Sequence, residues 1–302
     1  DNLDAALVRS DKAGFATRRE ASRKAGKLRG IGVACFLETS RGAPNEGAEV
    51  RFESDGQVTI AVGTESNGQG HETAYAQIAA DRLGLPIRTF RYVQADTTAV
   101  KSGAGHGGAR SMHMGGTAVV KAIDAVLAKA RKLAAHLLQA SEDELLFADG
   151  RFAVRGSDRS IDLFALARSA RDSASLPDGM MPGLGEHVMN MSDVFTFPSG
   201  CHVAEVEIDP ETGITSLVRY VAVDDYGRLI NPLLTEGQVQ GGVAQGIGQA
   251  LLEHTVYDPD SGQLVSGSFM DYALPRADDL PAFAIALIER PTQANPLGVK
   301  GS

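Results

Sequence analysis

Two stretches of the chain share one pattern, and this repetition constrains the fold more than any other feature. Residues 50–83 have the pattern of two strands around the turn Asp55-Gly56, then a Gly-Gln loop and a helix. Residues 203–253 repeat that order around a turn at Gly213. Asp-Gly supplies the positive φ of a tight turn, and a hairpin followed by a helix forms a sheet-plus-helix layer. We therefore predict an α+β fold of two similar sheet-plus-helix units around a shared central groove, with the two Gly-Gln segments facing it from opposite sides.

The best candidate for a linker between the two units is 174–185, which contains two prolines and four Gly or Ser residues. It predicts a first unit at 1–173 and a second at 186–302. Residue patterns outside the repeat predict further elements. They are a helix over 1–29 broken at Gly14, strands at 31–37, 89–95 and 283–289, helices at 111–140 and 161–170, and hairpins at 142–157 and 255–265.

The composition bounds the class of protein. The chain has 302 residues, 43% of them apolar, which is ordinary for a globular protein of two domains. A formal charge of -9 argues against nucleic-acid binding, which draws its affinity from a basic surface. No apolar stretch approaches the roughly 20 residues that span a bilayer, so we expect no membrane partner. Two cysteines, Cys35 and Cys201, exclude a disulfide framework and favour a reducing compartment.

The first segment that could carry chemistry is Gly63–Thr73, which leaves a strand and enters a helix. Glycines let a backbone approach a ligand closely, and the free N–H groups of a helix start favour anions. The amide of Gln69 donates and accepts, which suits a pterin or nucleobase edge. A plain turn capped by Thr73 is equally compatible with this segment alone. A HExxH zinc site is excluded, because Tyr75 stands where the second histidine is needed.

The second segment, Gly103–Ser111, matches GxGxxG formally. A Rossmann site is disfavoured here, because the loop does not follow a strand directly and Asp124 lies inside the next helix. The N–H groups of the loop, together with Arg110, could hold a phosphate or pyrophosphate. A flexible connection is the alternative.

The third segment, Gly237–Gln249, has five Gly and four Gln in thirteen residues. Each interior Gly costs a helix up to about 1 kcal/mol against Ala, so close approach to another backbone or a ligand is the better explanation. Tight helix packing alone is the alternative explanation. The terminal segment Asn295–Ser302 indicates little by itself.

Together these segments resemble the molybdenum-binding subunit of the xanthine dehydrogenase/aldehyde oxidase family, the molybdenum hydroxylases, and most closely its carbon monoxide dehydrogenase-like large subunits. Six phrases in family order, covering nearly the whole chain, carry the resemblance. They are Gly68–Thr73 with Gln77–Gly84, Asp96-Thr97, Gly107–Ser111, Asn231-Pro232, Gly237–Gly242 with Gln245-Gly246, and Gly298–Gly301.

The resemblance implies a molybdenum-dependent oxidoreductase that hydroxylates an aldehyde, an N-heterocycle or CO with oxygen from water. Its cofactor would be molybdopterin cytosine dinucleotide, and electrons would leave through a 2Fe-2S small subunit and an FAD medium subunit. A cytoplasmic location goes with this assignment. The residues that it places at the cofactor are Gln69, Gly70, His71, Thr73, Gly107, Gly108, Arg110, Ser111, Gln238, Gln240 and Lys300. Ala109 replaces the serine of many relatives, which removes one side-chain hydrogen bond but not the backbone cradle.

The resemblance also implies that this sequence is either a fragment of a longer subunit or one part of a naturally split subunit. In the family, the glutamate that acts as general base follows Val-Lys-Gly within a few residues, so we expect it just beyond Ser302 and assign no catalytic residue here. The N-terminal half of the same subunit, which chooses the substrate, is expected as a partner. General-base help is typically worth roughly 10²–10⁴-fold, so residues 1–302 alone should have no hydroxylase activity. The alternatives are a non-catalytic scaffold whose loops serve only packing and, more weakly, an NAD-dependent enzyme.

Overall fold

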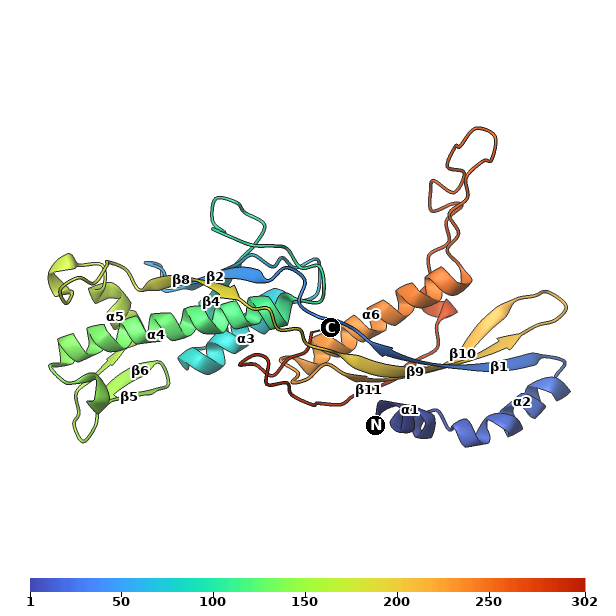
Figure 1. The fold of residues 1–302 in the computed structure, drawn as a ribbon, viewed down its shortest axis with the longest axis horizontal. Coiled ribbons are helices and arrows are strands. Elements are labelled where there is room, and N and C mark those ends of the chain that lie inside the picture. The colour runs from blue at the N-terminus through green and yellow to red at the C-terminus, as the bar shows by residue number, and fades with distance from the viewer. Residues whose placement is uncertain (302) are drawn as a thin grey trace. The chain divides into compact units, whose positions relative to one another are not determined.

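The computed structural model describes residues 1–301, which form an α+β fold, as predicted. The chain makes two compact units, and each is built from segments that are distant in sequence (Figure 1). The first unit consists of Asp1–Glu38 and Phe197–Arg290. The second consists of Thr39–Thr196 and Pro291–Gly301.

The first unit is a four-stranded sheet in the order β1-β9-β10-β11, with helices on both faces. All neighbours are antiparallel except β10 and β11, which the helix α6 connects as a parallel pair. Ala6 of α1 packs on Cys201, Val203 and Val221 on one face, and α6 packs Val239 and Val243 on the other. The elements are α1 (Asn2–Arg9), α2 (Phe15–Lys24), β1 (Leu28–Leu37), β9 (Ser199–Ile208), β10 (Thr215–Asp225), α6 (Pro232–Leu251) and β11 (Phe283–Leu287).

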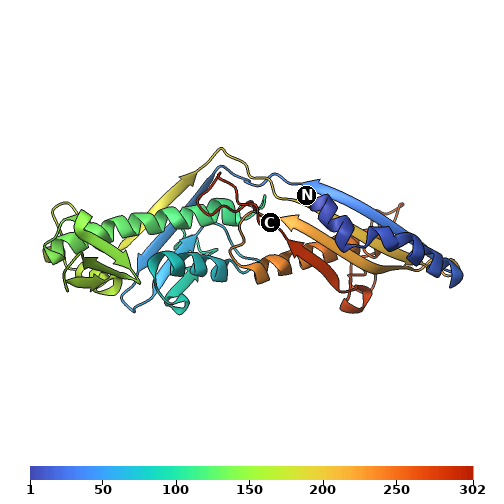
Figure 2. The same ribbon diagram turned by 90° about the horizontal axis from the view of Figure 1, so that it is seen from below.

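The second unit has a sheet in the order β4-β3-β2-β8, and α3 and α4 lie side by side on one face of it (Figures 1 and 2). A small three-stranded sheet and a short helix complete the unit. The main elements are β2 (Asn45–Phe52), β3 (Val58–Val62), α3 (His71–Leu83), β4 (Phe90–Val93), α4 (Thr117–Leu138) and β8 (Gly185–Met191). The small sheet holds β5 (Leu145–Ala148), β6 (Arg151–Val154) and β7 (Ser160–Asp162), followed by α5 (Leu163–Ser169).

The predicted repeat is confirmed as a shared topology. In each unit an antiparallel hairpin is followed by a helix and by a strand parallel to the second hairpin strand: β2-β3-α3-β4 and β9-β10-α6-β11. Each sheet is completed by a strand that directly precedes the other repeat. Thus β1 precedes β2 but pairs with β9, and β8 precedes β9 but pairs with β2.

This exchange of strands is why the compact units differ from the contiguous halves 1–173 and 186–302. Residues 174–185 do not separate two units; they lie inside the second unit, between α5 and β8. Two other details differ from the expected elements. The hairpin at 255–265 is reduced to one bridge between Tyr257 and Leu264 in a long loop after α6 (Figure 1), and Gly237-Gln238 lies within α6 rather than in a loop before it.

Candidate functional site

Three of the predicted segments meet in the second unit. The loop after β3 and the loop before α4 touch where Gly63 faces Gly103: a Cβ on Gly63 would lie 2.1 Å from the Cα of Gly103. Further along, Asn67 Nδ2 lies 3.1 Å from His106 Nε2. The contact therefore joins the first and second glycine-rich segments into one continuous surface.

Val299–Gly301, from the terminal segment, packs against the Gly103–Ser111 loop. Ser40 and Thr196 form an antiparallel bridge beside it. The Ser40 hydroxyl donates to the Ala109 carbonyl (2.5 Å), and the Thr196 hydroxyl donates to the Lys300 carbonyl (2.7 Å). A Cβ on Gly301 would lie 2.3 Å from the Ala109 carbonyl oxygen, so only glycine fits there. Lys300 is thereby placed beside the Gly107–Ser111 loop, as a shared ligand site requires.

The helix α3 begins at the centre of this surface. Gly70 precedes it in the left-handed region (φ 76°), and no side chain caps its first turn. The first N–H groups of a helix have no intrahelical partner, so this end favours an anion or a polar ligand. Gly70, His71 and Thr73 lie at this helix start, and Thr73 does not cap it.

His71 has an unsatisfied polar atom at this helix end. The residue is 4% exposed, and its Nδ1 has no hydrogen-bond partner among residues 1–301. Burial lowers the pKa of His71 to about 4, so the ring is neutral near pH 7. A buried, unpaired ring nitrogen costs about 1–3 kcal/mol, which a hydrogen-bonding ligand would recover.

Gln69 is held by its own loop. Its side-chain carbonyl accepts hydrogen bonds from the Asn67 backbone N–H and from the Ser66 hydroxyl. These bonds fix the orientation of the half-buried amide next to the start of α3.

Arg110 lies in the site but is no cofactor contact. The side chain is fully buried, and its Nε and both Nη atoms donate inside the unit. The acceptors are the carboxylate of Glu46 and the carbonyls of Arg41, Ala43, Asn45 and Gly105. A guanidinium has five N–H groups, and these five acceptors use all of them. The predicted role in holding phosphate is therefore wrong for Arg110, which instead fixes the loop.

Glu46 is the partner that the sequence analysis missed. It is fully buried at the start of β2, and its Oε1 accepts from the Gly47 N–H (3.0 Å). A Cβ on Gly63 would lie 2.1 Å from the same oxygen, so the carboxylate lies under both loops. No sequence signal singles out Glu46, because the same strand also contains Asn45, Glu49 and Arg51 and its burial is visible only in the structure.

Tyr75 links the helix to the turn that follows Arg110. Its hydroxyl donates to the Ser111 carbonyl (2.8 Å) and lies 2.6 Å from the Thr64 hydroxyl. Ser111 opens a π-helical turn, Ser111–Gly116, that leads into α4. The loop thus runs from β4 through more than a dozen residues into a π turn, which is not the tight strand-to-helix turn of a dinucleotide-binding Rossmann unit.

Gly107 and Gly108 form the exposed edge of the cradle. A Cβ on Gly107 would meet nothing within 4 Å, whereas Gly108 packs on Gly42 with φ at 91°. One glycine leaves open space and the other permits a close approach, so the backbone of Gly107 is accessible to a ligand.

Gln238 and Gln240 belong to the first unit, on α6. Both are exposed, and the amide of Gln240 donates to Glu236 one turn earlier (3.4 Å). Residues 1–301 hold no group of three or more metal-ligating side chains, and no helix among them is long and apolar enough to cross a membrane.

The sequence profile of the molybdopterin cofactor-binding domain matches residues 5–281. The chain belongs to this family. Similar curated proteins include the nicotine 6-hydroxylase large subunit of Paenarthrobacter nicotinovorans, which is 36% identical over 99% of this chain, and the carbon monoxide dehydrogenase large chain of Hydrogenophaga pseudoflava, which is 34% identical over 99%. The chain spans 38% of the length of each.

A solved structure of a molybdopterin-domain relative shows the same fold. Quinoline 2-oxidoreductase from Pseudomonas putida 86 superimposes with a TM-score of 0.89 at 32% identity, over 99% of this chain and 40% of that one. The domain in hand therefore corresponds to about two fifths of such subunits.

Proposed function

We propose that this chain is the molybdopterin dinucleotide-binding part of the large subunit of a molybdenum hydroxylase. The observation that carries the proposal is the meeting of residues 63–73, 102–111 and 299–301 in one cradle of a domain of this family. The cradle fits a polar, anionic cofactor, because it offers an uncapped helix start, an unpaired buried nitrogen on His71 and the open backbone of Gly107. When bound, the molybdenum centre supplies the two-electron oxidation of the substrate.

Within the cradle, Gly70, Thr73, Gly107, Gly108 and Ser111 would hold the cofactor through backbone N–H groups and short side chains. Gln69 and His71 would add hydrogen bonds to a pterin edge, and Lys300 would add a positive charge near the phosphates. Arg110 and Glu46 act only through the loops that they fix. For Gln238 and Gln240 of the first unit, a cofactor contact stays a prediction that rests on the family resemblance alone.

The finer assignments belong to the same proposal. The dinucleotide is the cytosine form, and the substrate is an aldehyde, an N-heterocycle or CO, oxidised with water. Electrons pass to 2Fe-2S and FAD subunits in the cytoplasm. The rest of the large subunit supplies the substrate pocket, so this chain by itself turns over no substrate.

The test is cofactor content of the full-length large subunit, purified with its natural partners. We expect one molybdenum and one pterin per subunit, with CMP released on acid hydrolysis. The variant Gly107→Val adds bulk where the structure has open space, so it should keep the fold and lose at least ten-fold in cofactor content. Ala148→Val, at an exposed position at the end of β5, is the matched control and should retain the cofactor.

Two results would overturn the proposal. A folded wild-type subunit without molybdenum and pterin would favour the scaffold alternative. Full cofactor content in the Gly107→Val variant would show that the cradle does not bind the cofactor. Turnover assays with CO, aldehydes and N-heterocycles then identify the substrate class.

A further inference from the structure

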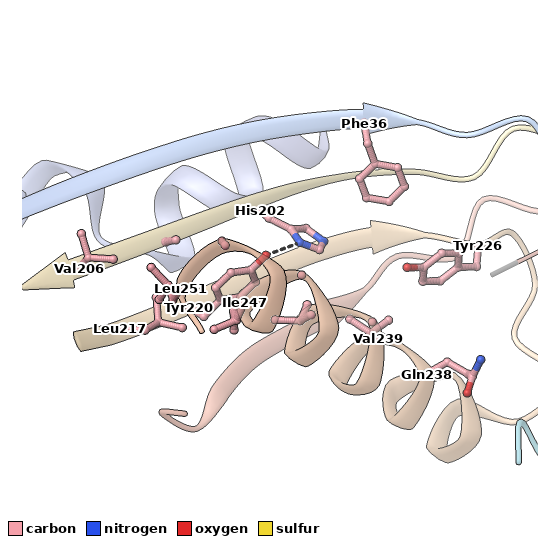
Figure 3. A pocket seen from close by; sticks show the side chains of 15 residues that line it. Phe36, His202, Val206, Leu217, Tyr220, Tyr226, Gln238, Val239, Ile247 and Leu251 are labelled. Atoms are coloured by element: carbon pink, nitrogen blue, oxygen red, sulfur yellow. Dashed lines mark hydrogen bonds between the residues drawn. The ribbon is translucent and has the colours of Figure 1, made fainter. Parts of the chain in front are cut away.

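The first unit has an open groove beside α6 (Figure 3). It has a volume of about 670 Å³ and runs between the helix and the sheet, where it is lined by residues of β9 and β10 and by Phe36 of β1. Phe36, His202 and Val206 line it from the sheet, and Gly242 and Ile247 line it from the helix. The groove lies within one unit, so it is a property of that unit alone.

The second unit repeats the topology of the first, and it has a helix at the position that corresponds to this groove. In the second unit, α3 corresponds to α6, while β8 and β2 correspond to β1 and β9. There the second helix, α4, packs beside α3 and covers β8 and β2. In the part of the first unit that the structure describes, nothing occupies the position of α4, and the groove is that uncovered half of the sheet.

The small residues along the groove suit the close approach of a backbone. A Cβ on Gly242, on Gly246 or on Gly32 would meet nothing within 4 Å. Gly32 is paired with Ala204 across β1 and β9, and paired antiparallel residues face the same side of a sheet. Both walls of the groove therefore leave room for a helix to approach closely.

The polar groups in the groove need no charged partner. His202 is bonded through both ring nitrogens, to the Tyr220 hydroxyl (2.9 Å) and to the buried Asp224 carboxylate (3.0 Å). The Tyr226 hydroxyl donates to the same carboxylate (3.2 Å). This network satisfies itself. Apart from Gln238, the remaining lining is aliphatic, aromatic or glycine, so the occupant should present a mainly apolar face.

The length of the groove sets the length of its occupant. Lining residues on α6 run from Gln238 to Leu251, and at 1.5 Å per residue this is about 20 Å. A helix of about four turns covers it. Its face would carry small and aliphatic residues every three or four positions, like the buried face of α4 that contains Ala118, Ala122 and Val126.

We propose that the groove beside α6 is the docking site for a second helix of the same large subunit, equivalent in the repeat to α4. The order of elements also gives its place in the chain. Since α4 follows the fourth strand of its repeat, β4, the missing helix should follow the corresponding strand, β11, and the loop that ends at Gly301. The curated relatives are more than twice as long as this chain, which leaves ample sequence for it.

The test uses the full-length large subunit and thiol labelling. In a Cys35→Ser background, Gly246→Cys places a thiol in the groove, and Gln249→Cys places one on an exposed position of α6 outside it. Cys201 is buried and serves as the internal reference. We expect the thiol from Gly246→Cys to react with a maleimide at least ten-fold more slowly than that from Gln249→Cys in the native subunit, and equally fast in denaturing urea.

A benzophenone maleimide attached through Gly246→Cys then identifies the neighbour after irradiation and peptide mass spectrometry. We expect a cross-linked peptide that follows residue 302 in the large subunit and has an apolar helical periodicity. Equal labelling of the two thiols in the native subunit would overturn the proposal. So would a cross-linked peptide from an earlier part of the subunit, from another subunit or from a second copy.

Discussion

Replacing Arg110 should destabilise the cradle more than replacing any residue that is proposed to contact the cofactor. The side chain is fully buried and links five acceptors around one point, including the buried carboxylate of Glu46. Arg110→Met keeps much of the apolar stem and removes the charge and all five donors. Glu46 would then be left as an unpaired charge in the interior.

The expected cost follows from that burial. Removing one partner of a buried ion pair costs about 3–5 kcal/mol, mostly from the charge left behind. A unit of this size loses about 2–4 °C in melting temperature per kcal/mol, so Arg110→Met should melt roughly 6–20 °C lower. Glu46→Gln should be destabilising too, and the double variant should lose less than the sum, with a coupling of about 0.5–3 kcal/mol.

The assay is urea and thermal unfolding followed by circular dichroism, with Arg82→Met as the matched control. Arg82 pairs with Asp124 at 2.8 Å, but the side chains are 34% and 56% exposed. An exposed pair contributes only about 0.2–1 kcal/mol. If Arg110→Met stays within about 1 kcal/mol of the wild type, like the control, the structural role assigned to Arg110 is refuted.

Three further changes test the same site and the helix α6 of the first unit. Gly63→Ala should destabilise the protein by about 1–3 kcal/mol in urea unfolding, because its Cβ would lie 2.1 Å from Gly103; wild-type stability would contradict the contact. His71 has a folded pKa of about 4 against an ordinary value of 6.5, so the unfolded state binds more protons between these values. Wild-type stability should therefore fall by up to about 3 kcal/mol from pH 6.5 to 4 relative to His71→Asn, and parallel pH profiles would disprove this. Gly241→Ala should stabilise α6 by up to about 1 kcal/mol in thermal melting, because the added Cβ meets nothing within 4 Å, and a lower melting temperature would show that the position is crowded.

Most local elements of this fold could be predicted, because residues at their ends require particular backbone conformations. Gly56 turns the β2–β3 hairpin with φ at 85°, and Gly84 ends α3 with φ at 63°. Asn231 caps α6 by accepting from the Leu234 N–H, and Pro232 follows at the first helical position. Signals of this kind act within a few residues, so they are visible in sequence.

Pairing between distant strands could not be predicted in the same way. β8 carries Glu186, His187 and Asn190 among its methionines, so it has no clear alternation and was not expected as a strand. Without β8, nothing indicated that β2 needs a partner from residue 185 onward. The proline and glycine content of 174–185 then favoured a linker, although the segment only connects two elements of one unit.

The candidate site was predictable in its segments but not in the role of each residue. Glycine spacing located the cradle, because close approach and positive φ at Gly70 and Gly108 leave few other choices. An arginine in such a loop suggests an anion contact, and only the structure shows that its five donors are used by Glu46 and the neighbouring carbonyls. Burial, which decides between these roles, depends on long-range contacts that no local pattern reports.

The exchange of β1 and β8 explains why a duplicated pattern does not give two independent domains. Each repeat supplies three strands and a helix of one sheet, and the fourth strand comes from the segment before the other repeat. An edge strand without its partner leaves a row of unpaired N–H and C=O groups, so neither repeat can complete its sheet from its own contiguous sequence. The cradle depends on the same connection, because the Ser40–Thr196 bridge that holds the Ala109 and Lys300 carbonyls lies where the chain passes between β1 and β2 and between β8 and β9. The strand exchange and the loop geometry at the cofactor cradle are therefore consequences of one topology.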